Sequence, residues 1–205
     1  ALEFFEKAVD ANVVNADLFA QSALAAFEAG HVELANTHAD RAFRLAPTRL
    51  WSVRAKWGTF LNPADVNGLV EFFERIAADP RFKIAGEMNL AMAYAVAGRW
   101  RDAADIYETR YAAGETWFLY HWDADWGISH ALMLATVRKN LGQPYDGIVE
   151  DVTTLLGNLE QQPMTSAGMT YLRASIAAIG GDEDAALGLL ADAHAQGWRR
   201  WWWTD

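Results

Sequence analysis

Apolar residues recur at three- and four-residue intervals along most of the chain, which is the spacing that places them on one face of an α-helix. The clearest runs cover residues 16–29, 32–45, 63–78, 82–97, 100–113 and 182–195. No segment shows the convincing alternation of a half-buried strand. Turns rich in glycine or proline separate the runs. The pattern predicts an all-α protein of about eleven short helices.

The best-marked helix start in this pattern is Asn62-Pro63. Asparagine can accept hydrogen bonds from the free N–H groups of a first turn, and proline loses no hydrogen bond at the first helical position. We therefore expect a helix that begins at Pro63 and is capped by Asn62.

Two segments of the chain share residue types at matching places around a turn glycine. Gly98 lies 68 residues after Gly30, and Pro80 lies 33 residues after Pro47. The segment Leu90-Ala91-x2-Tyr94, the turn Gly98-Arg99-Trp100 and then Ala103-x3-Tyr107 resemble the tetratricopeptide repeat (TPR) family, whose repeat is 34 residues long. Small residues at such places let paired helices approach closely, and glycine permits the tight turn.

This resemblance implies a right-handed α-solenoid of antiparallel helix pairs, with about six repeats of which the first is incomplete. The expected single domain 1–205 holds units at about 1–15 (partial), 16–49, 50–81, 84–117, 128–161 and 167–200. Ala1, Phe5 and Ala8 fit the second helix of the partial unit. An aromatic insertion at 114–126 lengthens one of the intervals between units.

Composition narrows the classes of function. The chain has 27 acidic and 17 basic side chains, a net charge of −10 and no cysteine. An acidic protein is a poor ligand for nucleic acid or an anionic membrane surface, and thiolate metal sites and disulfides are excluded. No apolar run is long enough to insert into a membrane. We expect a cytoplasmic protein, and a periplasmic one is the alternative, because the absence of cysteine fits both compartments.

The insertion 114–126 is the place where chemistry could reside. His121, Asp123 and Asp125 alternate there among tryptophans, so they could offer a nitrogen and two oxygens to a metal, or carboxylates to a sugar. The calcium-loop pattern fails at this place, and the chain has no nucleophile elbow or nucleotide-binding glycine motif. Helix capping and aromatic packing explain these residues better. We expect no catalytic residue, cofactor or metal, and keep a small enzyme or a metal or sugar site as the alternative.

In the TPR family the first helices of successive units line a concave groove that holds a peptide or a helix. The resemblance therefore implies a non-catalytic protein–protein interaction module with a protein or peptide partner. The carboxylate clamp of the chaperone-binding subgroup is not expected, because Ala20 and Leu24 stand where its first two groups would be. The residues that the resemblance places on or near the groove, or that the insertion adds to it, are Gln21, Arg54, Trp57, Asn89, Met92, Trp122, Trp126, Asn140 and Tyr171.

Two further expectations concern the ends of the chain. The tail after Gly197-Trp198 resembles the helical-repeat ends attached to bacterial winged-helix regulators and nucleotide cyclases, which implies a scaffold or sensor segment of a larger signalling protein. Repeat ends need polar caps, and neither end has an obvious one. A homodimer through the repeat ends is therefore a further hypothesis.

Overall fold

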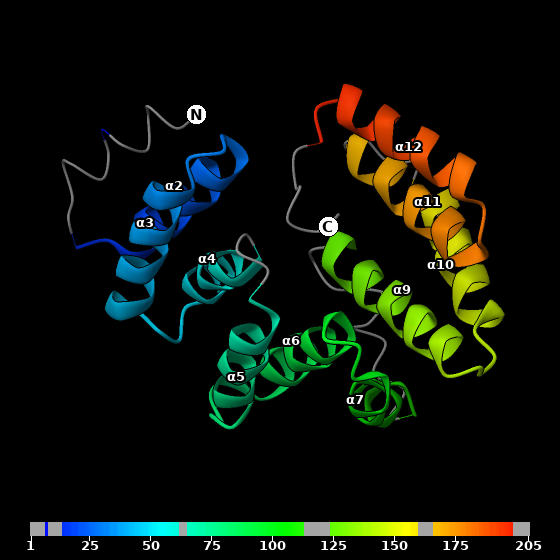
Figure 1. Cartoon of the computed structure of the whole chain (residues 1–205), viewed down its shortest axis with the longest axis horizontal. Helices are drawn as coiled ribbons and strands as arrows, with labels where there is room; N and C mark the ends of the chain where they lie inside the picture. Colours follow the sequence, from blue (N-terminus) through cyan, green and yellow to red (C-terminus); the bar gives the residue numbers. More distant parts are fainter. Residues whose placement is uncertain (1–6, 8–13, 62–64, 113–123, 160–165, 199–205) are drawn as a thin grey trace. The chain divides into compact units, whose positions relative to one another are not determined.

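The computed structural model describes residue 7 and residues 14–61, 65–112, 124–159 and 166–198 (Figure 1). The regular elements in these ranges are α-helices. They are α2 (Ala16–Glu28), α3 (Val32–Leu45), α4 (Leu50–Leu61), α5 (Val66–Ala77), α6 (Lys83–Val96), α7 (Trp100–Ala112), α9 (Ala124–Asn140), α10 (Asp146–Leu159), α11 (Ser166–Gly180) and α12 (Glu183–Ala195).

Several of the helix pairs turn back at a glycine. Gly30, Gly98 and Gly181 have φ angles of 78°, 71° and 85°, in the left-handed region that glycine enters without a steric penalty. After α2, the amide of Gly30 donates to the carbonyl of Phe27 at 3.0 Å, and that of His31 donates to Ala26 at 2.8 Å. These bonds satisfy the last carbonyls of α2 and start α3 at once.

The described helices form two compact units that divide after Gly86. In the first unit, α2 packs on α3, both pack on α4, and α4 packs on α5. Alanines fill the close approaches between these helices, because their small side chains let two backbones come near each other. Ala20, Ala23, Ala39, Ala42 and Ala55 are fully buried in one cluster with Phe19.

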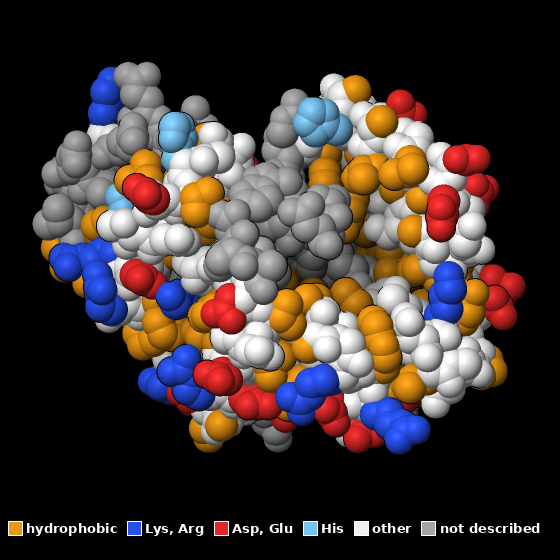
Figure 2. Space-filling view, viewed as in Figure 1, with side chains coloured by type: hydrophobic (Ala, Val, Ile, Leu, Met, Phe, Trp, Pro, Cys, Tyr) orange, Lys and Arg blue, Asp and Glu red, His pale blue; other side chains and the backbone are white. Residues whose placement is uncertain are grey.

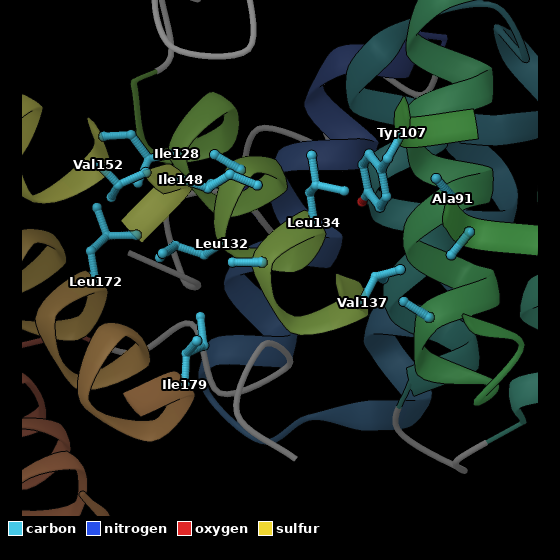
Figure 3. Close-up of a cluster of buried hydrophobic side chains, with 14 of the residues drawn as sticks. Ala91, Tyr107, Ile128, Leu132, Leu134, Val137, Ile148, Val152, Leu172 and Ile179 are labelled. Atoms are coloured by element: carbon cyan, nitrogen blue, oxygen red, sulfur yellow. The ribbon is translucent and has the colours of Figure 1, made fainter. Parts of the chain in front are cut away.

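The second unit, which begins at Glu87, is built around α9. This helix contacts α7, α10 and α11. Leu134 and Val137 lie toward Tyr107 and Ala91, whereas Ile128 and Leu132 lie toward Ile148 and Val152 (Figure 3). A helix that packs on both sides must be apolar on both, so α9 carries no single hydrophobic stripe.

The start of α5 corrects one prediction. The helix begins at Val66, and its cap is Asp65, whose carboxylate accepts from the amide of Gly68 at 2.9 Å. The predicted start at Pro63 with an Asn62 cap is therefore wrong. An ionised carboxylate is an equally good cap and also carries the charge that a helix N-terminus favours. Residues 62–64 lie outside the described ranges.

The remaining predictions about segments fall partly outside these ranges. Ala1, Phe5 and Ala8 do so, as do residues 113–123 of the aromatic insertion and residues 199–205 of the tail. The last three residues of the insertion, 124–126, belong to α9. Of the helices described, none is long and apolar enough to cross a lipid bilayer.

Candidate functional site

The two predicted groove residues Gln21 and Arg54 lie on first helices of pairs in the first unit. Gln21 is half-buried on α2. Arg54 is half-buried on α4, and its guanidinium lies 5.5 Å from the centre of the Trp51 ring. The aromatic face restrains the arginine, while its partial exposure leaves it accessible from solvent. Both side chains are therefore partly accessible, and their role in binding stays a prediction.

Three other predicted groove residues are buried. Trp57 on α4 is 5% exposed, and Asn89 and Met92 on α6 are 5% and 2% exposed. The Trp57 ring meets Phe73 of α5 edge-on, with ring centres 5.8 Å apart. These side chains are held among the helices in the structure described, so contact with a ligand would require them to rearrange. Their role in a groove stays a prediction.

The predicted residues of the C-terminal pairs have different surroundings. Asn140 is exposed at the end of α9, and its amide nitrogen donates to the carbonyl of Thr136 at 2.9 Å. Tyr171 on α11 is half-buried and stacks on Trp198, with ring centres 4.1 Å apart and planes 13° from parallel. This burial raises the pKa of the Tyr171 hydroxyl. One face of Tyr171 is thus already occupied by an aromatic ring of the same chain.

Most of the aromatic insertion lies outside the described residues. Trp122, His121 and Asp123 lie outside the described residues, and Trp126 and Asp125 belong to α9, with side chains that are not described. Among the side chains that the structure does describe, no group of three or more His, Asp or Glu residues could hold a metal ion.

Sequence reasoning missed two polar contacts that join one helix pair to the next. Lys56 of α4 donates to Asp40 of α3 at 2.5 Å, and Arg138 of α9 makes two bonds to Glu108 of α7, at 2.6 and 2.7 Å. The Glu108 carboxylate raises the pKa of the Arg138 guanidinium. Asp40 and Glu108 each stand ten residues after a turn glycine, and this shared register is the signal that could have revealed them.

A third missed contact is buried. The Tyr107 hydroxyl of α7 and Nδ1 of His130 of α9 are 3.1 Å apart, and both residues are 0% exposed. Burial raises the pKa of Tyr107 well above its usual value, because a phenolate would lose its hydration in the core. The contact aligns α7 with α9.

Comparison with known proteins identifies the fold. The sequence matches no protein-family profile and has no significant match among curated proteins. A crystal structure of a tetratricopeptide repeat protein from Parabacteroides merdae ATCC 43184 matches 97% of this chain and 72% of its own, with TM-score 0.60 and 12% identity.

Two further solved structures agree. PilW, a widely conserved type IV pilus biogenesis factor, matches 93% of this chain and 82% of its own, with TM-score 0.53 and 16% identity. A Podosopora anserina protein assigned as a kinesin light chain, with nearly identical TPR-like repeats, matches 87% of this chain and 92% of its own. Its TM-score is also 0.53 and its identity 16%. At these identities the likeness concerns the fold, and the predicted fold class is confirmed: the chain is an all-α, TPR-like protein of helix pairs.

Proposed function

We propose that the chain is a non-catalytic protein–protein interaction module that binds a peptide or a helix along the first helices of its pairs. The observation that carries the proposal is the TPR-like fold over nearly the whole chain. Stacked helix pairs present a repeated surface, and a peptide or helix can lay its side chains along such a surface. We infer a scaffold or sensor role, in the cytoplasm or alternatively in the periplasm.

The accessible candidates on these helices are Gln21, Arg54, Asn140 and one edge of Tyr171. Amide and guanidinium groups can bond to the backbone carbonyls of a peptide, and amides can also bond to its N–H groups. Such contacts fix the register of a bound segment and leave its specificity to side chains. This mixture of amide, guanidinium and aromatic groups favours a ligand whose main chain makes part of the binding contacts.

Peptide selection tests the proposal. A random peptide library displayed on phage is selected against the whole chain, and the affinity of each enriched peptide is measured by calorimetry. Arg54→Ala should lower the affinity of a peptide that binds the first unit about tenfold, and Asn140→Ala that of a peptide that binds the second unit, because truncating a contact in the centre of an interface typically costs about 1–2 kcal/mol or more.

The matched controls are Arg44→Ala of α3 and Asn158→Ala of α10. Both residues are exposed on second helices, so these changes should leave the affinity unchanged. Thermal unfolding of each variant shows whether the fold is intact. The proposal fails if no peptide is enriched, if the control variants weaken binding as much as the test variants do, or if the purified chain proves to be an enzyme.

A further inference from the structure

In the last described helix, α12, several apolar side chains are exposed and others are half-buried. It packs on α11, yet Ala193 is its one buried residue. Leu187 is 66% exposed, and Leu189 and Leu190 are half-buried. A helix rich in leucine and alanine gains most of its stability from burying an apolar face, so the exposed stripe calls for an explanation.

Equivalent positions on two other second helices are buried or half-buried, apart from Tyr111 of α7, which is 42% exposed. Counted from the turn glycine, the positions six, nine, ten and thirteen residues later form one stripe along the helix, which we call the docking stripe. Its members are Asn36, Ala39, Asp40 and Phe43 on α3, Ala104, Tyr107, Glu108 and Tyr111 on α7, and Leu187, Leu190, Ala191 and His194 on α12.

Contacts from the docking stripes of α3 and α7 show which helix packs on each stripe. Asp40 of α3 is bonded to Lys56 of α4, and Glu108 of α7 is bonded to Arg138 of α9. Tyr107 of α7 is bonded to His130 of α9. In both cases the docking stripe holds the first helix of the following pair, and that helix supplies a cation at the contact.

On α12 the two leucines of the docking stripe are less covered. Leu187 is 66% exposed where Ala104 of α7 is 7% exposed. Leu190 is half-buried where Ala39 and Tyr107 are fully buried. The α12 stripe therefore has the register of a helix-docking surface, with leucines at the two positions where α3 carries Asn36 and Ala39.

The charges beside the stripe indicate what kind of helix fits. Asp182, Glu183, Asp184 and Asp192 are all exposed, and residues 182–195 include no lysine or arginine. Acidic side chains gather over the place where α12 lies (Figure 2). A second copy of this chain that docked through its own α12 would bring the same acidic helix and be repelled, whereas a cationic helix would be attracted.

We propose that the docking stripe of α12 binds an amphipathic helix of a partner protein, one that carries lysine or arginine beside an apolar stripe. Leu187 and Leu190 pack against the apolar side chains of this helix, and the acidic groups at the start of α12 face its cations. This surface lies on a second helix and does not depend on the peptide site proposed for the first helices.

The probe is a fluorescently labelled peptide of about 20 residues, made of leucine and lysine at helical spacing. Its affinity for the whole chain is measured by fluorescence anisotropy, and a peptide with glutamate in place of lysine serves as the control ligand. We expect the lysine peptide to bind, more weakly as salt is raised, and the glutamate peptide not to bind.

Two pairs of matched variants locate the binding. Leu187→Gln should weaken binding about tenfold through lost apolar burial, whereas Thr154→Gln, at an exposed position of α10, should not. Neutralising Glu183 and Asp184 together, to Gln and Asn, should weaken binding more than the same change at Glu150 and Asp151 of α10. All four acidic residues are exposed, so folding should survive each change, and thermal unfolding checks this.

Several outcomes would overturn the proposal. The proposal fails if the lysine peptide does not bind the chain. If the α10 and α12 variants weaken binding equally, the peptide is attracted only by the net negative charge of the chain. A dimer in sedimentation that Leu187→Gln dissociates would make a second copy the occupant. Arg54→Ala should leave the affinity of the lysine peptide unchanged, so failure here is distinguishable from failure of the peptide site on the first helices.

Discussion

Tyr107 and His130 show how a single residue pair aligns two helices. Their contact of 3.1 Å is enclosed in the apolar core between α7 and α9. A buried hydroxyl costs free energy unless it is hydrogen-bonded, so the pair favours one alignment of these helices over others. The sequence around each residue gives no sign of this, since each occupies an apolar helix face.

At the residue scale the first prediction concerns pH. Burial raises the pKa of Tyr107 and of Tyr171 in the folded state. The unfolded chain releases these protons near pH 10 while the folded chain keeps them, so the free energy of unfolding should fall as the pH rises above about 10. Tyr107→Phe should lower this free energy by about 1 kcal/mol at pH 7 and make the alkaline fall shallower. Urea unfolding at pH 7 to 11 measures the free energy at pH 7 and its fall at alkaline pH. If Tyr107→Phe left the alkaline slope unchanged, Tyr107 would not be a source of this fall.

A second prediction at this scale concerns the turns. Gly98 has φ of 71°, and a Cβ added there would meet nothing within 4 Å, so any cost of Gly98→Ala is a backbone cost. It should destabilise the chain by about 1 kcal/mol. Gly188→Ala within α12 also meets nothing within 4 Å and should stabilise by about 0.5–1 kcal/mol. Thermal unfolding of both variants measures these changes in stability. Stability changes of the same sign in the two variants would contradict the turn geometry.

At the scale of elements, hydrogen-bonded caps set where several helices begin. Asn15, Asp65 and Asp182 each accept from an amide three residues later, at the starts of α2, α5 and α12. The sequence analysis placed the cap of α5 at Asn62, because proline favours the first helical position, whereas the observed cap is Asp65. Local pattern fixes such a boundary only to within a few residues.

The cap of α5 gives the prediction for this scale. Asp65→Ala should lower the free energy of unfolding by about 1 kcal/mol, because the amide of Gly68 loses its acceptor. Asn67→Ala, at an exposed position two residues further on, should be close to neutral. Urea unfolding compares the two variants. Equal stability of Asp65→Ala and the unaltered chain would argue that the helix begins elsewhere.

At the scale of the whole molecule, the sequence predicted the helix pairs, the turn glycines and the TPR-like fold. It could not separate groove residues from core residues. Trp57 and Met92 share the helical spacing of accessible neighbours such as Arg54, yet they are buried, because burial depends on which helix packs above each face. The spacing also could not show that α9 packs on two sides.

Charge is distributed unevenly through the described chain. Asp40, Glu87 and Glu108 form ion pairs with cations of neighbouring helices. From α10 onward the acidic side chains in the described ranges are exposed, and Arg173 is the one described arginine or lysine after Lys139. These three earlier charges thus contribute to contacts between helices, whereas the acidic side chains from α10 onward are displayed to solvent and available to a cationic partner.

The most direct test of the account is the mapping of a selected peptide on the chain by NMR. Backbone amide shifts are followed while a peptide enriched by phage display is added. We predict that the largest changes fall on first helices, either on α2 and α4 near Gln21 and Arg54 or on α9 and α11 near Asn140. Changes confined to the second helices α3, α5, α7 and α10, or the absence of saturable changes, would contradict the proposed binding surface.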